Sequence, residues 1–226
     1  MIALRGLPSE NGKPDTGIVY GAAACGLEGQ MVTRAELASG VERAFLDHGY
    51  QYLTMSALAD AIDVTRRTVY NYFGSKEEAF RFLIEDANAR AVAAGLAAGR
   101  ACLDQGQDVV EIFATILDVR YGDNRRRVGK SPHAVEINDQ AFRRCRDLMI
   151  ASAIAFQAEL AAFIRELEAA RRLRLKPDVD ADSLAQLLAD GARGTNQSLP
   201  PADPETLKLR YRAMVGAILY GAATQP

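Results

Sequence analysis

The sequence predicts an all-α protein with about nine helices. Apolar residues recur every three or four positions through most of the chain, as they do on the buried face of an amphipathic helix. Several of these stretches begin with a capping residue that is followed three positions later by Glu, which is a start signal for a helix. The chain has neither the alternating pattern of a strand nor a glycine-rich nucleotide-binding motif.

Composition and cysteine usage narrow the class of protein. With 226 residues, of which 49% are hydrophobic, the chain can bury a full core in one domain or two small ones. We find no apolar run long enough to span a bilayer and expect no membrane contact. Cys25, Cys102 and Cys145 lie far apart without a CxxC pair, which indicates a reducing cytoplasm and no metal site. Three ordinary thiols are the favoured interpretation, and a thiol sensor beside the arginines near Cys145 is the alternative.

The first predicted helix covers residues 33–48. Thr33 and Glu36 form a capping box, in which each side chain accepts a hydrogen bond from a backbone N–H at the helix start. Gly49 is the expected stop. Two shorter helices follow over residues 56–62 and 66–73, with a turn at Asp63 and Thr65 as the second N-cap.

The helix over residues 66–73 has two unlike sides. Val69, Tyr72 and Phe73 should face inward, whereas Arg67 and Asn71 share the opposite side, four positions apart. An exposed Arg can bind guanine through two hydrogen bonds, and Asn can bind adenine in the same way. This helix therefore has the composition of a helix that reads the DNA major groove.

The same stretch resembles the helix-turn-helix of the TetR family of transcriptional regulators. The resemblance covers about residues 33–82 and rests on the ordered motif Val64-Thr65-x-x-Thr68-x-Tyr70-x-Tyr72-Phe73-x-Ser75-Lys76-Glu77. One position departs from the family, because Asp63 stands where a small residue, often Gly, usually precedes the Val. Asp tolerates turns, so the departure is compatible with the resemblance.

The resemblance implies three segments. Residues 1–30, which contain Pro8 and Pro14, are a flexible extension; residues 31–80 are the helix-turn-helix DNA-binding domain; residues 81–226 form a helical ligand-binding and dimerisation domain. Two interpretations of residues 1–30 stay open: translation starts at Met31, or these residues form an arm that contacts DNA.

The expected DNA contacts lie at the second helix of the motif and beside it. Base contacts are expected from Arg66, Arg67 and Asn71. Phosphate or mixed contacts, partly carried over from the family, are expected from Thr54, Thr68, Tyr70, Tyr72 and Lys76. Residues 33–80 hold five basic against seven acidic residues, a net charge of −2, so we expect modest non-specific affinity for DNA.

The remaining helices follow from periodicity and breakers. A capping box at Ser75 and Glu78 opens a helix that should fray or end within residues 91–100, near Gly95 and Gly99. The next helix covers residues 109–121 and breaks at residues 122–124. Residues 125–133 are basic and predict a solvated loop, with an anion-binding loop as the alternative. A long helical block covers residues 134–172, and the last two helices cover residues 182–192 and 204–223.

By the resemblance, the last two helices form a homodimer interface and the helices before them enclose a small-molecule pocket. Dimerisation has an independent argument, because one short helix contacts too few base pairs to discriminate between sites. The candidate lining of the pocket is apolar and aromatic, with Asn88 or Gln157 as polar markers: Phe113, Leu117, Tyr121, Phe142, Met149 and Phe156. The alternative is that these six residues are plain core.

Three functions compete at this stage. The first is a cytoplasmic DNA-binding regulator, a repressor that binds a palindromic operator as a homodimer and is released by a small-molecule effector. The second is a dimeric interaction or scaffold protein that keeps the fold without binding an operator. The third, an enzyme, is not favoured, because the chain has two His residues, no nucleophile signature and no paired-carboxylate motif, and we expect no cofactor.

Overall fold

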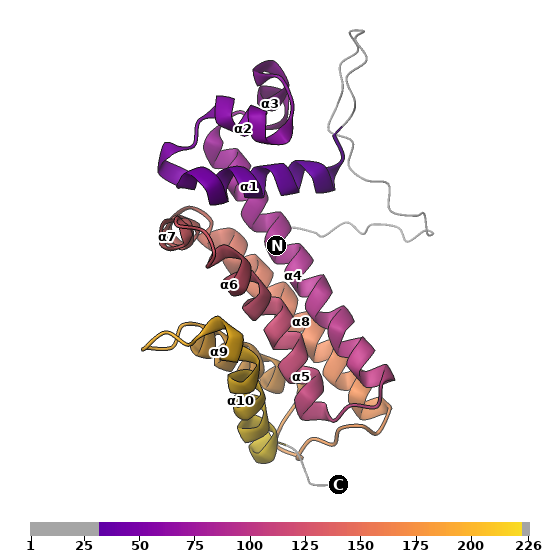
Figure 1. Ribbon diagram of the computed structural model, residues 1–226. Coiled ribbons are helices and arrows are strands. Elements are labelled where there is room, and N and C mark those ends of the chain that lie inside the picture. The colour runs from indigo at the N-terminus through magenta and orange to yellow at the C-terminus, as the bar shows by residue number, and fades with distance from the viewer. Residues whose placement is uncertain (1–31, 223–226) are drawn as a thin grey trace, which may run out of the picture. The chain divides into compact units, whose positions relative to one another are not determined.

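A computed structural model describes residues 32–222 of the chain, and the flexible extension expected over residues 1–30 lies outside them. The all-α prediction with about nine helices is confirmed for the described residues (Figure 1). The first half holds α1 (Arg34–Tyr52), α2 (Met55–Ile62), α3 (Arg66–Tyr72), α4 (Lys76–Asp104), α5 (Val109–Leu117) and the π-helical turn η1 (Asp118–Gly122). The second half holds α6 (Asp123–Val128), α7 (Ala134–Arg144), α8 (Arg146–Ala169), α9 (Ala181–Asn196), the 3₁₀ turn η2 (Pro204–Thr206) and α10 (Leu207–Ala222).

The predicted caps are largely present. The capping box of α1 is complete, because Thr33 Oγ1 accepts from Glu36 N at 3.2 Å and Glu36 Oε2 accepts from Thr33 N at 2.8 Å. The box predicted for α4 is only half formed. Ser75 caps the helix, but the Glu78 carboxylate accepts from Gly74 N at 2.8 Å instead of from Ser75 N. At Gly49 the backbone of α1 kinks with φ 70°, and helical structure resumes to Tyr52.

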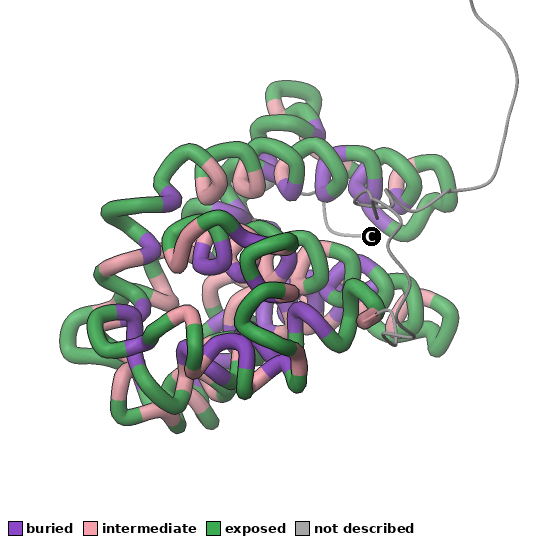
Figure 2. The backbone as a smooth tube through the Cα atoms, turned by 90° about the horizontal axis from the view of Figure 1, so that it is seen from above, coloured by how far each residue is buried: buried purple, intermediate pink, exposed green. Residues whose placement is uncertain are grey.

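Two hydrophobic cores lie along α4. We call α1, α2 and α3 the head and α5 to α10 the body. The head core contains residues of α1 to α4 and also Ile137 and Ala141 of α7. The body core contains residues of α4, α5, α8, α9 and α10. Figure 2 shows the buried stretches gathered where these helices face one another. Because α4 adds Phe80 to one core and Leu96 to the other, it belongs to both.

The prediction that the helix after Ser75 frays or ends within residues 91–100 is wrong, because α4 continues unbroken for 29 residues. The two glycines serve packing instead. A Cβ at Gly95 would lie 2.9 Å from Ile116 O, and a Cβ at Gly99 would lie 2.4 Å from Ile116 Cγ1. Without side chains, these positions let α5 approach the backbone of α4 closely, which offsets the weak helix propensity of glycine.

The predicted break at residues 122–124 and the solvated basic loop after it are also wrong in part. The helix continues from α5 through η1 into α6, which contains three consecutive arginines. Arg125 donates to Ala202 O at 3.0 Å, Arg126 binds Asp118 at 2.9 Å, and Arg127 binds Glu42 at 2.9 Å. These arginines are therefore connectors within the protein, and only residues 129–133 form a loop.

The helical block predicted over residues 134–172 is two helices, separated at Cys145. Burial raises the pKa of the Cys145 thiol, which favours the ordinary-thiol interpretation. The expectation that no apolar run could span a bilayer is wrong, because α8 is long and apolar enough by length and composition alone. Its Phe156 and Phe163 side chains are fully buried in the body core, and 28% of its apolar stretch is buried.

The glycine contacts between α4 and α5 generate a stability prediction. Gly99→Ala should lower the free energy of unfolding by about 1–3 kcal/mol, because the added methyl group meets Ile116 in a packed core. Helix propensity alone predicts the opposite sign, a gain of about 1 kcal/mol. Urea unfolding followed by circular dichroism measures the difference. The exposed Ala97→Gly variant of the same helix is the control and should lose only about 1 kcal/mol.

Candidate nucleic-acid interface

Helices α2 and α3 form a helix-turn-helix held by local hydrogen bonds. Thr54 caps α2 by accepting from Ala57 N at 3.1 Å, and Thr65 caps α3 by accepting from Thr68 N at 3.1 Å. Between them Asp63 adopts the left-handed conformation, with φ 60° and ψ 47°. Glycine adopts this backbone geometry at lower cost than other residues, in agreement with the small residue, often Gly, expected at this position from the resemblance.

The two sides of α3 are as predicted. Val69 is fully buried and Phe73, which follows the helix, is 5% exposed, so the back of α3 packs into the head core. Arg67 and Asn71 are exposed on the opposite side. The Arg66 guanidinium lies 5.9 Å from the centre of the Tyr70 ring, and that ring is itself 45% exposed. Four of the predicted contact residues, Arg66, Arg67, Tyr70 and Asn71, are therefore accessible on one short helix.

The other four predicted contact residues have structural partners. Thr54 is the exposed cap of α2, and Thr68 Oγ1 lies 2.8 Å from Thr65 Oγ1. Tyr72 is half-buried beside Phe73. Lys76 Nζ donates to Gln51 O at 3.1 Å, and it lies 4.9 Å from the centre of the Tyr50 ring. Burial, followed by the nearby Arg144 charge, lowers the pKa of Lys76.

Two of the seven acidic residues in residues 33–80 form ion pairs with arginines outside that segment. Glu42 binds Arg127 of α6 at 2.9 Å and Arg90 of α4 at 3.5 Å. Glu77 binds Arg144 of α7 at 3.0 Å. Arginines outside residues 33–80 thus neutralise Glu42 and Glu77, and Asp86 neutralises Arg34. Arg66 and Arg67 form no ion pair within residues 32–222, so both charges of α3 are available to an anionic partner.

The match to a known family covers the same residues as this helix-turn-helix. The sequence profile described as bacterial regulatory proteins, tetR family, matches residues 39–81, which include most of α1, all of α2 and α3 and the start of α4. Residues 39–81 therefore match the helix-turn-helix region of the tetR family. The resemblance predicted from the motif after Asp63 is thereby confirmed.

Curated relatives match the same part of the chain. The HTH-type transcriptional repressor AcnR of Corynebacterium efficiens is 34% identical over 58 residues, which are 26% of this chain and 31% of that relative. AcnR of Corynebacterium glutamicum is 34% identical over a stretch of the same extent. The match thus spans about a third of the length of these relatives.

Solved structures extend the similarity of fold to the body. A TetR transcription regulator from Haloarcula marismortui has a TM-score of 0.59 at 19% identity, covering 84% of this chain and 97% of that one. A transcriptional regulator from a Rhodococcus species has a TM-score of 0.58 at 18% identity, covering 85% and 98%. SmeT, the repressor of a multidrug efflux pump in Stenotrophomonas maltophilia, has a TM-score of 0.56 at 16% identity, covering 85% and 91%. The TetR-type fold therefore includes most of the chain.

The six residues predicted to line an effector pocket do not stay together. Phe113, Leu117 and Phe156 are fully buried in the body core, and the Tyr121 ring lies 6.0 Å from the Phe156 ring. By contrast, Phe142 is 51% exposed on α7, and Met149 packs against the head core. Residues of α7 and the start of α8 face a different core, which the periodicity of one long helix does not reveal.

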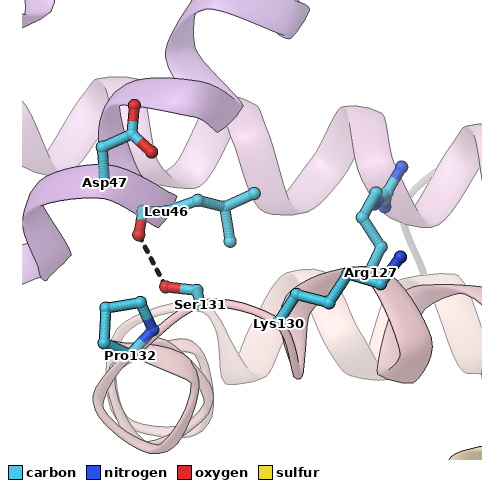
Figure 3. A pocket seen from close by; sticks show the side chains of 6 residues that line it. All are labelled: Leu46, Asp47, Arg127, Lys130, Ser131 and Pro132. Carbon is cyan, nitrogen blue, oxygen red and sulfur yellow. Dashed lines mark hydrogen bonds between the residues drawn. The ribbon is translucent and has the colours of Figure 1, made fainter.

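An open pocket of about 350 Å³ lies between α1 and the loop after α6 (Figure 3). It is lined by Leu46, Asp47, Arg127, Lys130, Ser131 and Pro132. Ser131 Oγ donates to Leu46 O at 2.6 Å, and Arg127 is already bound to Glu42. This pocket contains none of the six predicted lining residues, and its Ser131 contact is one of the links that hold the head against α7.

The left-handed residue of the turn generates a prediction on stability. Asp63→Gly should raise the free energy of unfolding by about 0.5–1 kcal/mol, because glycine adopts φ 60° without the clash of a Cβ. Asp60→Gly also removes one negative charge, but inside α2, and should lower the free energy of unfolding by about 0.5–1 kcal/mol. Urea unfolding of both variants separates the backbone effect from the charge effect. Equal changes in the two variants would contradict the assignment.

Proposed function

We propose that this protein is a cytoplasmic DNA-binding transcriptional regulator, a repressor that binds a palindromic operator as a homodimer and is released by a small-molecule effector. The observation that carries the proposal is the exposed side of α3, where Arg67 and Asn71 lie opposite the buried Val69. The curated relatives, which are named transcriptional repressors, support the same function.

The chemistry of α3 suits direct readout of bases. Arg66, Arg67 and Asn71 offer donors and an acceptor for base edges, and Tyr70 offers a ring that Arg66 already contacts. Thr54 and Lys76 border this helix and suit phosphates. Residues 31–80 serve as the reading domain in this proposal, and residues 81–226 as the effector and dimer domain.

A homodimer is supported by an apolar stripe on the outer side of α10. The buried side of that helix contains Leu207, Tyr211 and Val215. The opposite side exposes residues at helical spacing, with Leu209 at 70% and Tyr220 at 78% exposure and small residues between them: Leu209, Ala213, Ala217 and Tyr220. A stripe with small central residues allows a second helix to approach closely, which suits a two-fold interface between copies of this chain.

Communication between effector and DNA would use the links from head to body. In this proposal the body helices have two arrangements, which place the two α3 helices of the dimer at different spacings. An effector shifts the balance between them only if it binds one arrangement more tightly than the other. The Glu42–Arg127 and Glu77–Arg144 ion pairs and the shared helix α4 connect the two regions.

Selection of bound duplexes from a random DNA pool tests the proposal. The purified full chain at moderate salt should enrich a palindrome whose half-sites lie about one helical turn apart. If a folded dimer enriches no sequence, the scaffold interpretation replaces the regulator.

Two variants in the reading domain should change DNA binding in different ways. Asn71→Ala should relax base preference at one position in each half-site, at a cost of about 1–3 kcal/mol on the preferred sequence. Lys76→Ala should weaken binding to all sequences alike and lower the salt dependence by about one counterion per subunit. Fluorescence anisotropy at several salt concentrations measures both, and Arg165→Ala on the exposed side of α8 is the control. Identical profiles for the two variants would contradict the assigned roles.

The α10 stripe yields a prediction on assembly. Ala217→Arg should convert the dimer to a monomer, because it places a charge at the centre of an apolar interface. Light scattering after size-exclusion chromatography measures the mass. The exposed Ala97→Arg variant on α4 should leave the dimer intact. A dimer that survives Ala217→Arg would place the interface elsewhere.

A further inference from the structure

Arg120 is a buried cation at the centre of the body. It lies on the π-helical turn η1 and is 8% exposed. Its guanidinium is 5.0 Å from the centre of the Tyr121 ring and 5.7 Å from that of Phe156. The backbone of Gly95 on α4 passes close to it, since a Cβ there would lie 3.4 Å from Arg120 Cβ. Arginine is rarely buried to this extent without a charged partner.

The hydrogen bonds of Arg120 do not neutralise its charge. Its Nη2 donates to Asn88 Oδ1 at 3.1 Å and to Ser152 Oγ at 3.0 Å, and both acceptors are neutral. Its Nε is buried without a partner within residues 32–222. Burial, together with the charge of Arg193, lowers the pKa of Arg120. A buried cation in this state carries a desolvation cost that a bound anion would offset.

The acidic residue nearest to Arg120 in the sequence is already paired with another arginine. Asp118 is buried, and Arg126 binds both of its oxygens, at 3.1 and 2.9 Å. Arg126 also binds Asp123 at 2.6 Å. Arg126 therefore pairs with the Asp118 carboxylate, whereas Arg120 pairs with no carboxylate among the described residues.

Other unpartnered polar atoms occur on the helices that pack around η1. Arg193 Nη1 and Asn196 Oδ1 of α9 and Tyr211 Oη of α10 are buried without hydrogen-bond partners in the described part of the chain. Burial raises the pKa of Tyr211, so its hydroxyl stays a donor. Three of the four unpartnered groups, counting Arg120 Nε, are thus donors, and two of those belong to cations. Arg193 forms an ion pair with Asp190, whereas Arg120 is a cation with no acidic partner among the described residues, and its unpartnered Nε donor suits an oxyanion.

We propose that the effector is a small molecule with an anionic group, a carboxylate by chemical class, and that Arg120 binds this group while Tyr121 and Phe156 contact its apolar part. The proposal rests on the proposed function, whose effector it describes. Asn88 and Ser152 hold the guanidinium in place. Because Arg120 is almost inaccessible, the anion reaches it only when the body helices separate, so that binding is coupled to movement of α4 and α9.

The test compares acids with neutral analogues of the same shape. Hexanoate, benzoate and phenylacetate are titrated into the full chain by calorimetry at matched ionic strength, alongside hexanamide, benzamide and phenylacetamide. At least one acid should bind about 10- to 100-fold more tightly than its amide, as expected for a charge-assisted pair. Equal affinity of acid and amide, or no binding by any acid, overturns the proposal.

Variants of Arg120 assign the effect to that side chain. Arg120→Gln removes the charge but keeps a donor for Asn88 and Ser152, and it should abolish the preference for the acid. Arg120→Lys keeps the charge without the planar guanidinium and should retain part of the preference for the acid. Arg165→Gln, on the exposed side of α8, should change nothing. Far-UV circular dichroism verifies that each variant folds. An unchanged preference in folded Arg120→Gln overturns the proposal.

The outcome is separable from that of the proposed function. Operator selection uses the protein without ligand, whereas the acid–amide comparison contains no DNA. If no palindrome is enriched but the acid preference depends on Arg120, the anion site stands and the regulator does not. If a palindrome is enriched and the preference is absent, the regulator stands and its effector is not an anion.

Discussion

The close approach of α5 to α4 is the contact on which the rest of the structure depends. Gly95 and Gly99 permit it, because any side chain at either position would collide with Ile116. Once α5 is seated there, the chain can continue through η1 and α6 back toward the head, and α8 to α10 can close the body core. The same helix α4 places Phe80 in the head core. A single rigid element therefore fixes the α3 surface relative to the body.

Charge is distributed in a way that serves this connection. The acids Glu42 and Glu77 of the head-side helices bind arginines from α6 and α7, so their charges hold head and body together instead of repelling an anionic partner. Such half-exposed pairs contribute little stability individually, but each holds a side chain at a defined junction. Arg120 is the contrasting case, because its buried charge is left with neutral acceptors. Because the desolvation of this buried charge costs stability, Arg120 is a candidate contact for a ligand.

Local signals in the sequence predicted the head well. The caps at Thr33 and Thr65, the inward Val69 and the outward Arg67 follow from spacings of three or four residues, which local backbone geometry alone decides. The family motif lies entirely in this region. In the body, the same reasoning put Phe142 and Met149 beside Phe113, because periodicity indicates that a residue is buried but does not indicate which core buries it. Arg120 was overlooked, although it extends the apolar stripe of Ile112, Phe113, Ile116 and Leu117 by one step and so stands at an inward position.

The sequence by itself therefore determined the fold class, the helix-turn-helix and the polar face of α3, since each depends on neighbours within one or two helical turns. Tertiary structure alone decided that α4 passes through two glycines unbroken, that α6 is a helix whose arginines bind distant carboxylates, and that Arg120 is enclosed without a counter-charge. These outcomes depend on what lies opposite each residue in space. A glycine breaks an isolated helix but admits a neighbouring one, and an arginine solvated in a loop becomes a connector when an acid from another helix faces it.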